Sequence, residues 1–124
     1  MQILKSRAFS KWSAKEGLDD DALRNAIDEM ERGLIDADLG GQVVKKRVAV
    51  KGRGKRGGLR TLLAYRSHDK AFFVYGFAKN TRANISDDEL KALRRLASEL
   101  LSYSDKTLNR AIKFGELIEV VSDG

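Results

Sequence analysis

Positively charged side chains gather in one part of this sequence. Positions 43–70 hold ten lysines and arginines and one acid, Asp69, so this stretch carries a formal charge of +9. The ten cations are Lys45, Lys46, Arg47, Lys51, Arg53, Lys55, Arg56, Arg60, Arg66 and Lys70. Within it, the segment 52–58 alternates four glycines with three cations. Such a segment cannot bury apolar surface, and its like charges repel unless an anion lies against them. A polyphosphate backbone is the partner that this pattern favours.

A cluster of cations without a histidine as general base suits the cleavage of RNA. RNA carries its own nucleophile, the 2′-hydroxyl, so a protein need only align the groups and stabilise the developing charge. Arginines can hold phosphoryl oxygens bidentately. A lysine crowded by other cations can act as a base, and a second cation can protonate the leaving 5′-oxygen. Noncatalytic binders of nucleic acid also carry basic segments, so the pattern leaves both functions open.

Metal-assisted hydrolysis is a poor match to these residues. Magnesium that bridges phosphates needs convergent carboxylates, and the basic region offers none. The adjacent acids at 87–89 read as the first turn of a capped helix, which gives them a structural role. We therefore expect neither a metal site nor a cofactor.

The composition bounds the class of protein. With 124 residues, the chain is expected to form a single domain, 1–124. A pI of about 9.7 fits affinity for nucleic acid or an anionic membrane surface. The absence of cysteine excludes disulfides and thiolate metal sites. No apolar run approaches the length of a signal peptide core or a membrane span, so we expect a cytoplasmic protein with no membrane partner.

Local signals predict the helices. The first helix carries Phe9 and Trp12 and stops near Gly17, and the second begins after the N-cap Asp19 and closes at Gly33. Towards the C-terminus, 86–89 matches a capping box before a helix with leucines on one face. A shorter helix is expected to begin after Ser104 or Asp105 and to end at Gly115.

Between these helices the period changes to that of strands. Residues 43–51, 59–66 and 71–78 are rich in Val, Leu, Phe and Tyr and read as three strands joined by two hairpins. Short strands are expected at 3–6 and 117–121. The fold class is therefore α+β, with an antiparallel sheet of four to five strands, two N-terminal helices and C-terminal helices.

The second hairpin fixes a register. If its turn centres on 67–69, paired positions sum to about 137, so that Leu62 faces Tyr75 and Arg60 faces Phe77. Basic residues of separate segments then gather at one edge of the sheet. They are Arg53, Lys55, Arg56, Arg60, Lys79 and Arg82.

Other conspicuous residues have plainer interpretations. His68 lies in the opposite turn, about 26 Å from Arg60 at 3.3 Å per residue. The only histidine is therefore too far from the basic edge to act there as the general base. The rings of Phe73, Tyr75 and Phe77 are expected in the core, because helices must cover a sheet face.

Four segments resemble a known family. They are 33–41 (GLIDADLGG), 55–61 (KRGGLRT), 73–80 (FVYGFAKN) and 83–86 (ANIS). They are similar to the RelE-like toxins of bacterial toxin–antitoxin pairs, and within them to the HigB-type branch. The resemblance implies a microbial-RNase fold with an antiparallel sheet and helices on one side. It also implies a ribosome-dependent mRNA interferase, a hydrolase that inhibits translation, silenced by a cognate antitoxin of helix-turn-helix type.

The resemblance also assigns residues. The family arginine that clamps the scissile phosphate maps onto Arg60, and Lys51, Arg53 and Lys55 become candidates for base or phosphate contacts. The resulting catalytic candidates are Arg60, Lys55, Lys79 and Arg82, and the RNA-binding candidates are Lys51, Arg53, Arg56 and Asn80.

Two positions depart from the family pattern. Asn80 stands where many relatives have an arginine, and Ser86 where a tyrosine often stacks on a base. The acid role could then pass to Lys79 or Arg82. The alternatives are a ParE-like toxin that acts on DNA gyrase and a noncatalytic nucleic-acid-binding module.

Overall fold

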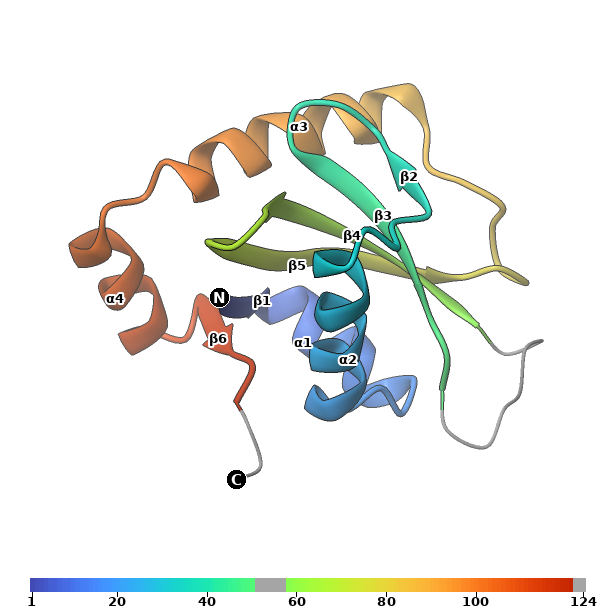
Figure 1. The fold of residues 1–124 in the computed structure, drawn as a ribbon, viewed down its shortest axis with the longest axis horizontal. Helices are drawn as coiled ribbons and strands as arrows, with labels where there is room; N and C mark the ends of the chain where they lie inside the picture. The colour runs from blue at the N-terminus through green and yellow to red at the C-terminus, as the bar shows by residue number, and fades with distance from the viewer. Residues whose placement is uncertain (51–57, 122–124) are drawn as a thin grey trace.

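The computed structural model describes residues 1–50 and 58–121, and it forms a six-stranded sheet with helices on both faces (Figure 1). The elements in chain order are β1 (Gln2–Ser6), α1 (Arg7–Lys15), α2 (Asp20–Glu31), β2 (Ala37–Asp38), β3 (Val43–Val48), β4 (Leu59–Arg66), β5 (Lys70–Ala78), α3 (Asp87–Leu101), α4 (Asp105–Lys113) and β6 (Leu117–Glu119). None of the described helices has the length and apolar character needed to cross a membrane.

The α+β prediction is confirmed, and the sheet differs from it in two details. Its strand order is β2-β3-β4-β5-β1-β6, which makes six strands instead of four to five. The additional strand, β2, is only two residues long, too short to show a period of two in the sequence. The sheet is also not wholly antiparallel, because β1 runs parallel to β5 with Leu4 opposite Phe72. Parallel neighbours need a long connection, and here about half of the chain, residues 7–69, lies between them.

The expectation that the helices lie on one side of the sheet was wrong. Helices α1 and α2 pack on β5 and β3, while α3 crosses the other face over β4 (Figure 1). The reason is that β4 is apolar on both faces. Leu63 joins the apolar cluster under α1 and α2, and its neighbour Ala64 joins the cluster under α3. Both residues are fully buried. A strand of this kind needs a covering layer on each side.

The predicted helix ends are confirmed by their capping contacts. Asp19 accepts a hydrogen bond from the Ala22 N–H at 2.9 Å, and Gly33 ends the following turn with a φ of 91°. At α3, Ser86 and Glu89 form the reciprocal capping box. These contacts satisfy backbone groups that the helix itself leaves without partners.

The cations of β3 are divided between the two faces of the sheet. This strand ends at Val48, earlier than the predicted position 51. Lys46 turns toward α2, where its ammonium group lies 2.8 Å from the carboxylate of Glu29 and donates to the Leu34 carbonyl at 2.9 Å. Its neighbours on either side point to the opposite face, because side chains alternate along a strand. The basic run therefore does not form one continuous surface.

The predicted register of the second hairpin is confirmed at its open end. Leu62 lies opposite Tyr75 and Arg60 opposite Phe77, so the paired positions sum to 137. A β-bulge follows at Val74, beyond which the sum falls to 136. As predicted, His68 lies in the turn at the other end, where its φ is 62°. The bulge shifts which side chains face each layer on the two halves of β5.

Gly76 allows α1 to approach the sheet closely. A Cβ placed on Gly76 would lie 2.2 to 2.6 Å from three ring carbons of Trp12. Real Cβ atoms do not come so close to other carbons. The indole of Trp12 therefore fills the space that any other residue at position 76 would need.

Replacing Gly76 by alanine should destabilise the protein by about 1–3 kcal/mol, the usual cost of overpacking a core. Urea unfolding followed by circular dichroism measures this change. The matched control is the same substitution in a Trp12→Leu background, where the smaller side chain removes the clash and the cost should fall. A Gly76→Ala variant as stable as the wild type would contradict this packing.

Candidate nucleic-acid interface

The site is built on the face of the sheet that α3 crosses. Val43 and Ala64, which face each other, belong to the cluster under α3. Toward the open end of the sheet, the next pair on the same face is Lys45 with Leu62, and the pair after it is Arg47 with Arg60. Side chains two apart on a strand share a face, so all of these lie on the α3 side. The third strand adds Tyr75 and Phe77 to the same face.

Arg47 and Arg60 lie side by side at the open end of this face. They are direct cross-strand partners, and both side chains pass close to Gly58. A Cβ placed on Gly58 would be 3.6 Å from Arg47 Cγ and Cδ and 3.7 Å from Arg60 Nη1. Like charges directly opposite each other destabilise a sheet. An anion bound between the two guanidinium groups would relieve that repulsion.

Arg82 brings a third guanidinium group to the same place. Its side chain lies over the ring of Phe77, with 5.7 Å between Cζ and the ring centroid. Phe77 is the residue opposite Arg60, so Arg82 reaches the neighbourhood of the two β-strand arginines. The connection that carries Arg82 folds back tightly, because the Ala78 carbonyl accepts from the Thr81 N–H at 3.1 Å and from the Arg82 N–H at 3.3 Å.

Glu89 holds the guanidinium of Arg82 in place. Arg82 Nη2 lies 2.6 Å from one carboxylate oxygen and Nη1 lies 3.0 Å from the other. Nη1 also donates to the Tyr75 hydroxyl at 3.1 Å, and Nε donates to the Asn84 carbonyl at 2.8 Å. Paired bonds of this kind fix both position and orientation. Arg82 is thus tied to β5, to its own loop and to the first turn of α3.

The same contacts change both pKa values. The bonds from Arg82, and next the backbone N–H of Ser86, lower the pKa of Glu89 to about 2. The pKa of Arg82 is raised, first by its hydrogen bonds to Glu89. An arginine held in this way keeps its proton and acts as a fixed positive charge. It is a weaker candidate for proton donation than the sequence indicated.

The remaining predicted residues fall into two groups. Lys79 and Asn80 are exposed in the turn that follows β5, and Ala78 just before them lies opposite Leu59. The register therefore places these two residues at the same end of the sheet as Arg60. The other four, Lys51, Arg53, Lys55 and Arg56, lie outside the described residues.

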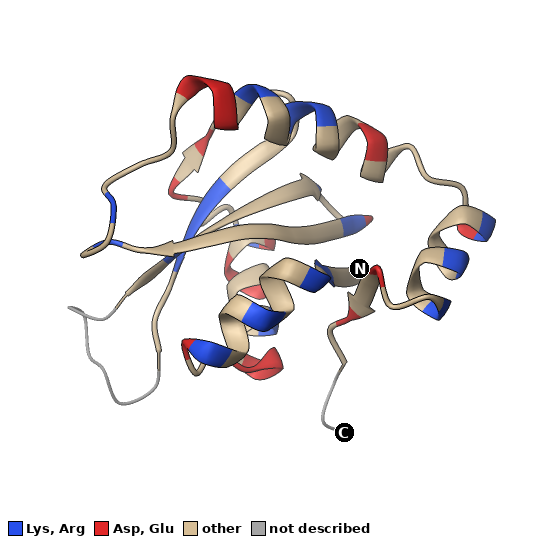
Figure 2. Ribbon diagram, turned by 180° about the vertical axis from the view of Figure 1, so that it is seen from behind, with Lys and Arg blue, Asp and Glu red and all other residues tan. Residues whose placement is uncertain are grey.

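Figure 2 shows how charge is distributed over the ribbon. Basic residues lie along β3 and in the connection after β5, while the first turn of α3 is acidic. In the part of the chain that the structure describes, no three His, Asp or Glu side chains are grouped so that they could hold a metal ion.

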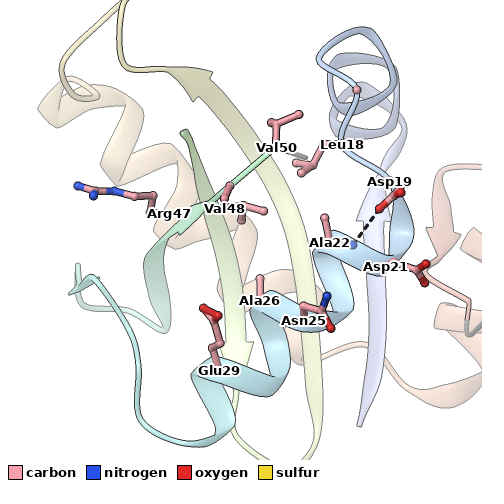
Figure 3. Close-up of a pocket in the computed structure, with 12 residues that line it drawn as sticks. Leu18, Asp19, Asp21, Ala22, Asn25, Ala26, Glu29, Arg47, Val48 and Val50 are labelled. Atoms are coloured by element: carbon pink, nitrogen blue, oxygen red, sulfur yellow. Dashed lines mark hydrogen bonds between the residues drawn. The ribbon is translucent and has the colours of Figure 1, made fainter. Parts of the chain in front are cut away.

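A cavity lies on the α2 face of the sheet, and Arg47 is one of its lining residues. It has a volume of about 620 Å³ and lies between the start of α2 and the end of β3, with Leu18, Ala22 and Val50 in its lining (Figure 3). Its acids already have partners, since Asp19 caps α2 and Glu29 pairs with Lys46. We therefore place the chemistry at the arginine cluster and not in this cavity.

Sequence reasoning missed three residues of this site. Arg47 was counted among the ten cations but was not assigned to a face of the sheet. Tyr75 was assigned to the core, and Glu89 was assigned only a role in capping its helix. The pairing of Arg47 with Arg60 could have been found by treating 52–55 as the centre of the first hairpin, since the two numbers sum to 107. No short-range signal links Glu89 to Arg82, because one residue belongs to a loop and the other to a helix.

Comparison with known proteins identifies the family. Residues 1–120 match the family described as the RelE toxin of the RelE/RelB toxin–antitoxin system. The chain belongs to the RelE family of toxins. Comparison with curated protein sequences gave no significant match.

Membership of the RelE family defines the general role. The chain is a toxin of the toxin–antitoxin type, of a family whose members are generally ribonucleases, and a cognate antitoxin is its implied partner. The match covers all the described elements, including the strands that carry Arg60 and Tyr75. It does not separate the branches of the family, so the HigB-type assignment stays a prediction.

The Arg82–Glu89 pair predicts a dependence of stability on pH. The pKa of Glu89 is lower in the folded protein than its ordinary value of 4.5, so its ionised form stabilises the fold above that value. The wild type should therefore be more stable than Glu89→Gln at pH 7. This advantage should decline as the pH falls below 4.5 and vanish near pH 2.

Free energies of unfolding measured at several pH values check this expectation. Glu116→Gln removes an exposed carboxylate at the other end of the molecule and serves as the control. An advantage of wild type over Glu89→Gln that is equal at pH 7 and pH 2 would refute the ion pair as its source.

Proposed function

We propose that this RelE-family toxin is a metal-independent endoribonuclease that cuts mRNA on the ribosome. The 2′-oxygen of one nucleotide attacks the adjacent phosphorus, and the bond from phosphorus to the 5′-oxygen of the next nucleotide breaks. The products are a 2′,3′-cyclic phosphate and a free 5′-hydroxyl. The nucleophile comes from the RNA, so the protein supplies alignment, charge and proton transfer.

One observation carries this proposal: Arg47 and Arg60 are cross-strand partners that both lie against Gly58. A phosphate held between two guanidinium groups can receive bidentate hydrogen bonds from each. Gly58 has no side chain to separate the two arginines from a ligand. Beneath them, Leu62 and Phe77 are buried, so the site has an apolar floor. Charges over such a floor act more strongly than charges surrounded by water.

The roles follow from these positions. Arg60 clamps the scissile phosphate, Arg47 assists it, and Arg82 provides a fixed charge. Lys55 and Lys79 are the candidates for moving protons. The predicted RNA contacts are Lys51, Arg53, Arg56 and Asn80.

The wider setting is also part of the proposal. The substrate is mRNA in the ribosome of the cytoplasm, and the toxin belongs to the HigB-type branch. The antitoxin is of helix-turn-helix type. The guanidinium groups of Arg47, Arg60 and Arg82 at one end of the sheet suit a ribosomal site, where rRNA and mRNA phosphates surround the toxin. No cofactor takes part in the reaction.

Arg60→Ala should lower the rate of mRNA cleavage by about 10²–10³-fold, the usual loss when one donor to a developing negative charge is removed. The expected result in cells is that induced expression no longer arrests growth. Cleavage is mapped by primer extension on cellular mRNA, and the rate is measured on ribosomes programmed with a short synthetic mRNA.

The matched control is Arg66→Ala, on the same strand at the opposite end, where the arginine pairs with Asp69. This variant should retain full activity. A folded Arg60→Ala protein that cleaves at the wild-type rate would refute the phosphate clamp. Growth arrest with DNA damage and intact mRNA would instead indicate an action on gyrase. RNA binding without cleavage or arrest would indicate a noncatalytic module.

Cleavage of free RNA should persist in EDTA, because the nucleophile is the 2′-hydroxyl of the RNA and no metal ion takes part. The products should carry 2′,3′-cyclic phosphate ends, which mass spectrometry of the 5′ fragment detects. Ribosomes themselves need magnesium, so this measurement uses free RNA at high enzyme concentration. A single 2′-deoxy substitution at the cut site should abolish cleavage, and cleavage of that RNA would contradict the mechanism.

A further inference from the structure

Tyr75 occupies an unusual position for an aromatic residue of this sheet. It is half-buried on the α3 face of β5, opposite Leu62. Among the described residues it packs into neither of the two apolar clusters. Its ring instead lies beside Phe77, at 6.2 Å between centroids. Tyr75 therefore belongs to the floor of the arginine site and not to the core.

The hydroxyl of Tyr75 is held in a definite orientation. Its oxygen accepts a hydrogen bond from Arg82 Nη1 at 3.1 Å. Within residues 1–50 and 58–121, no group accepts a hydrogen bond from this hydroxyl in return. A phenol is both a donor and an acceptor, so the structure uses its acceptor side and leaves its proton available. The cation on the acceptor side directs that proton away from Arg82.

Arg82 is itself fixed, so the arrangement is rigid. Glu89 binds two nitrogens of its guanidinium group, and the Ser86 N–H binds one oxygen of Glu89 at 2.9 Å. The first turn of α3 thus holds Glu89, Glu89 holds Arg82, and Arg82 holds the Tyr75 hydroxyl. A chain of contacts that ends in a free donor is suited to delivering a proton to a ligand.

The donor lies within reach of the phosphate site. Tyr75 is opposite Leu62, and Leu62 is two residues from Arg60. Diagonal neighbours on one face have Cα atoms about 7–8 Å apart, within reach of long side chains. A phosphate clamped by Arg60 can therefore present its leaving oxygen to the Tyr75 hydroxyl.

From this geometry we propose that Tyr75 is the general acid of the reaction, with Glu89 as a positioning residue that acts through Arg82. The inference rests on the proposed ribonuclease function. As the bond between phosphorus and the 5′-oxygen breaks, its electron pair stays on that oxygen, which takes the Tyr75 proton. The 2′-hydroxyl proton passes to a lysine base. The tyrosinate then takes a proton from solvent and the protonated lysine releases one, which together restore the enzyme.

A substrate with a sulfur leaving group tests this role directly. An RNA in which sulfur replaces the 5′-bridging oxygen releases a thiolate, which needs no protonation to leave. The linkage that the wild type cuts is mapped first and is then synthesised in both forms. With the oxygen linkage, Tyr75→Phe should lose about 10²–10⁴-fold in rate, the range of a general acid. With the sulfur linkage, its rate should approach that of the wild type.

Three controls keep the result interpretable. Tyr103→Phe removes the hydroxyl of a tyrosine beyond the end of α3 and should cleave both substrates normally. Arg60→Ala should be impaired on both substrates, because the phosphate clamp is needed for either leaving group. Glu89→Gln should show a smaller loss than Tyr75→Phe on oxygen and the same recovery on sulfur.

Two results would overturn the proposal. One is a Tyr75→Phe rate on the oxygen linkage equal to that of the wild type. The other is an equal loss on oxygen and sulfur, which would mean that Tyr75 contributes to binding or folding and not to proton transfer. Failure of the ribonuclease function itself is distinguishable, because the wild type would then cleave neither substrate.

Discussion

The pairing of β4 with β5 is the constraint on which the rest of this structure depends. The two strands are central in the sheet, and β4 is apolar on both faces, with Leu63 in the cluster under α1 and α2 and Ala64 in the cluster under α3. The hydrogen bonds that set this register also place Arg60 opposite Phe77. A slip of one residue would send Arg60 to the wrong face and expose the residues that form the two cores. The site and the core therefore share one set of backbone contacts.

The two ends of this hairpin differ in a way that explains where the site lies. At the turn, Glu31 at the end of α2 accepts from Ser67 Oγ at 2.8 Å and from the His68 N–H at 2.9 Å, which closes that end. At the open end α3 only begins, and the side chain of Arg82 lies over the buried ring of Phe77. The stems of long cationic residues can cover apolar surface while their charged heads meet water or a ligand.

Short segments of the sequence predicted much of the fold. The N-caps Asp19 and Ser86 and the glycines after helices act within a few residues, and the helices begin and end where they predict. The short turn at 67–69 sets a sum of 136 for the pairs beside it, and the bulge at Val74 brings the pairs at the open end to the predicted 137. The bulge at Val74 and the two-residue β2 gave no such signal. The second layer of helices was missed because β4, buried on both faces, does not alternate.

The site was only partly predictable, for an electrostatic reason. The sequence by itself determined that cations are concentrated around β3 and β4, that Arg60 starts a strand, and that the chain resembles RelE-like toxins. It did not determine which cations have an acidic partner in the folded protein. Only the tertiary structure decided that Lys46 is paired with Glu29 and Arg82 with Glu89, while Arg47 joins Arg60 beside Gly58. The interaction between two charged side chains weakens with the distance between them, and distances between separate segments are set by the packing of the sheet and its helices.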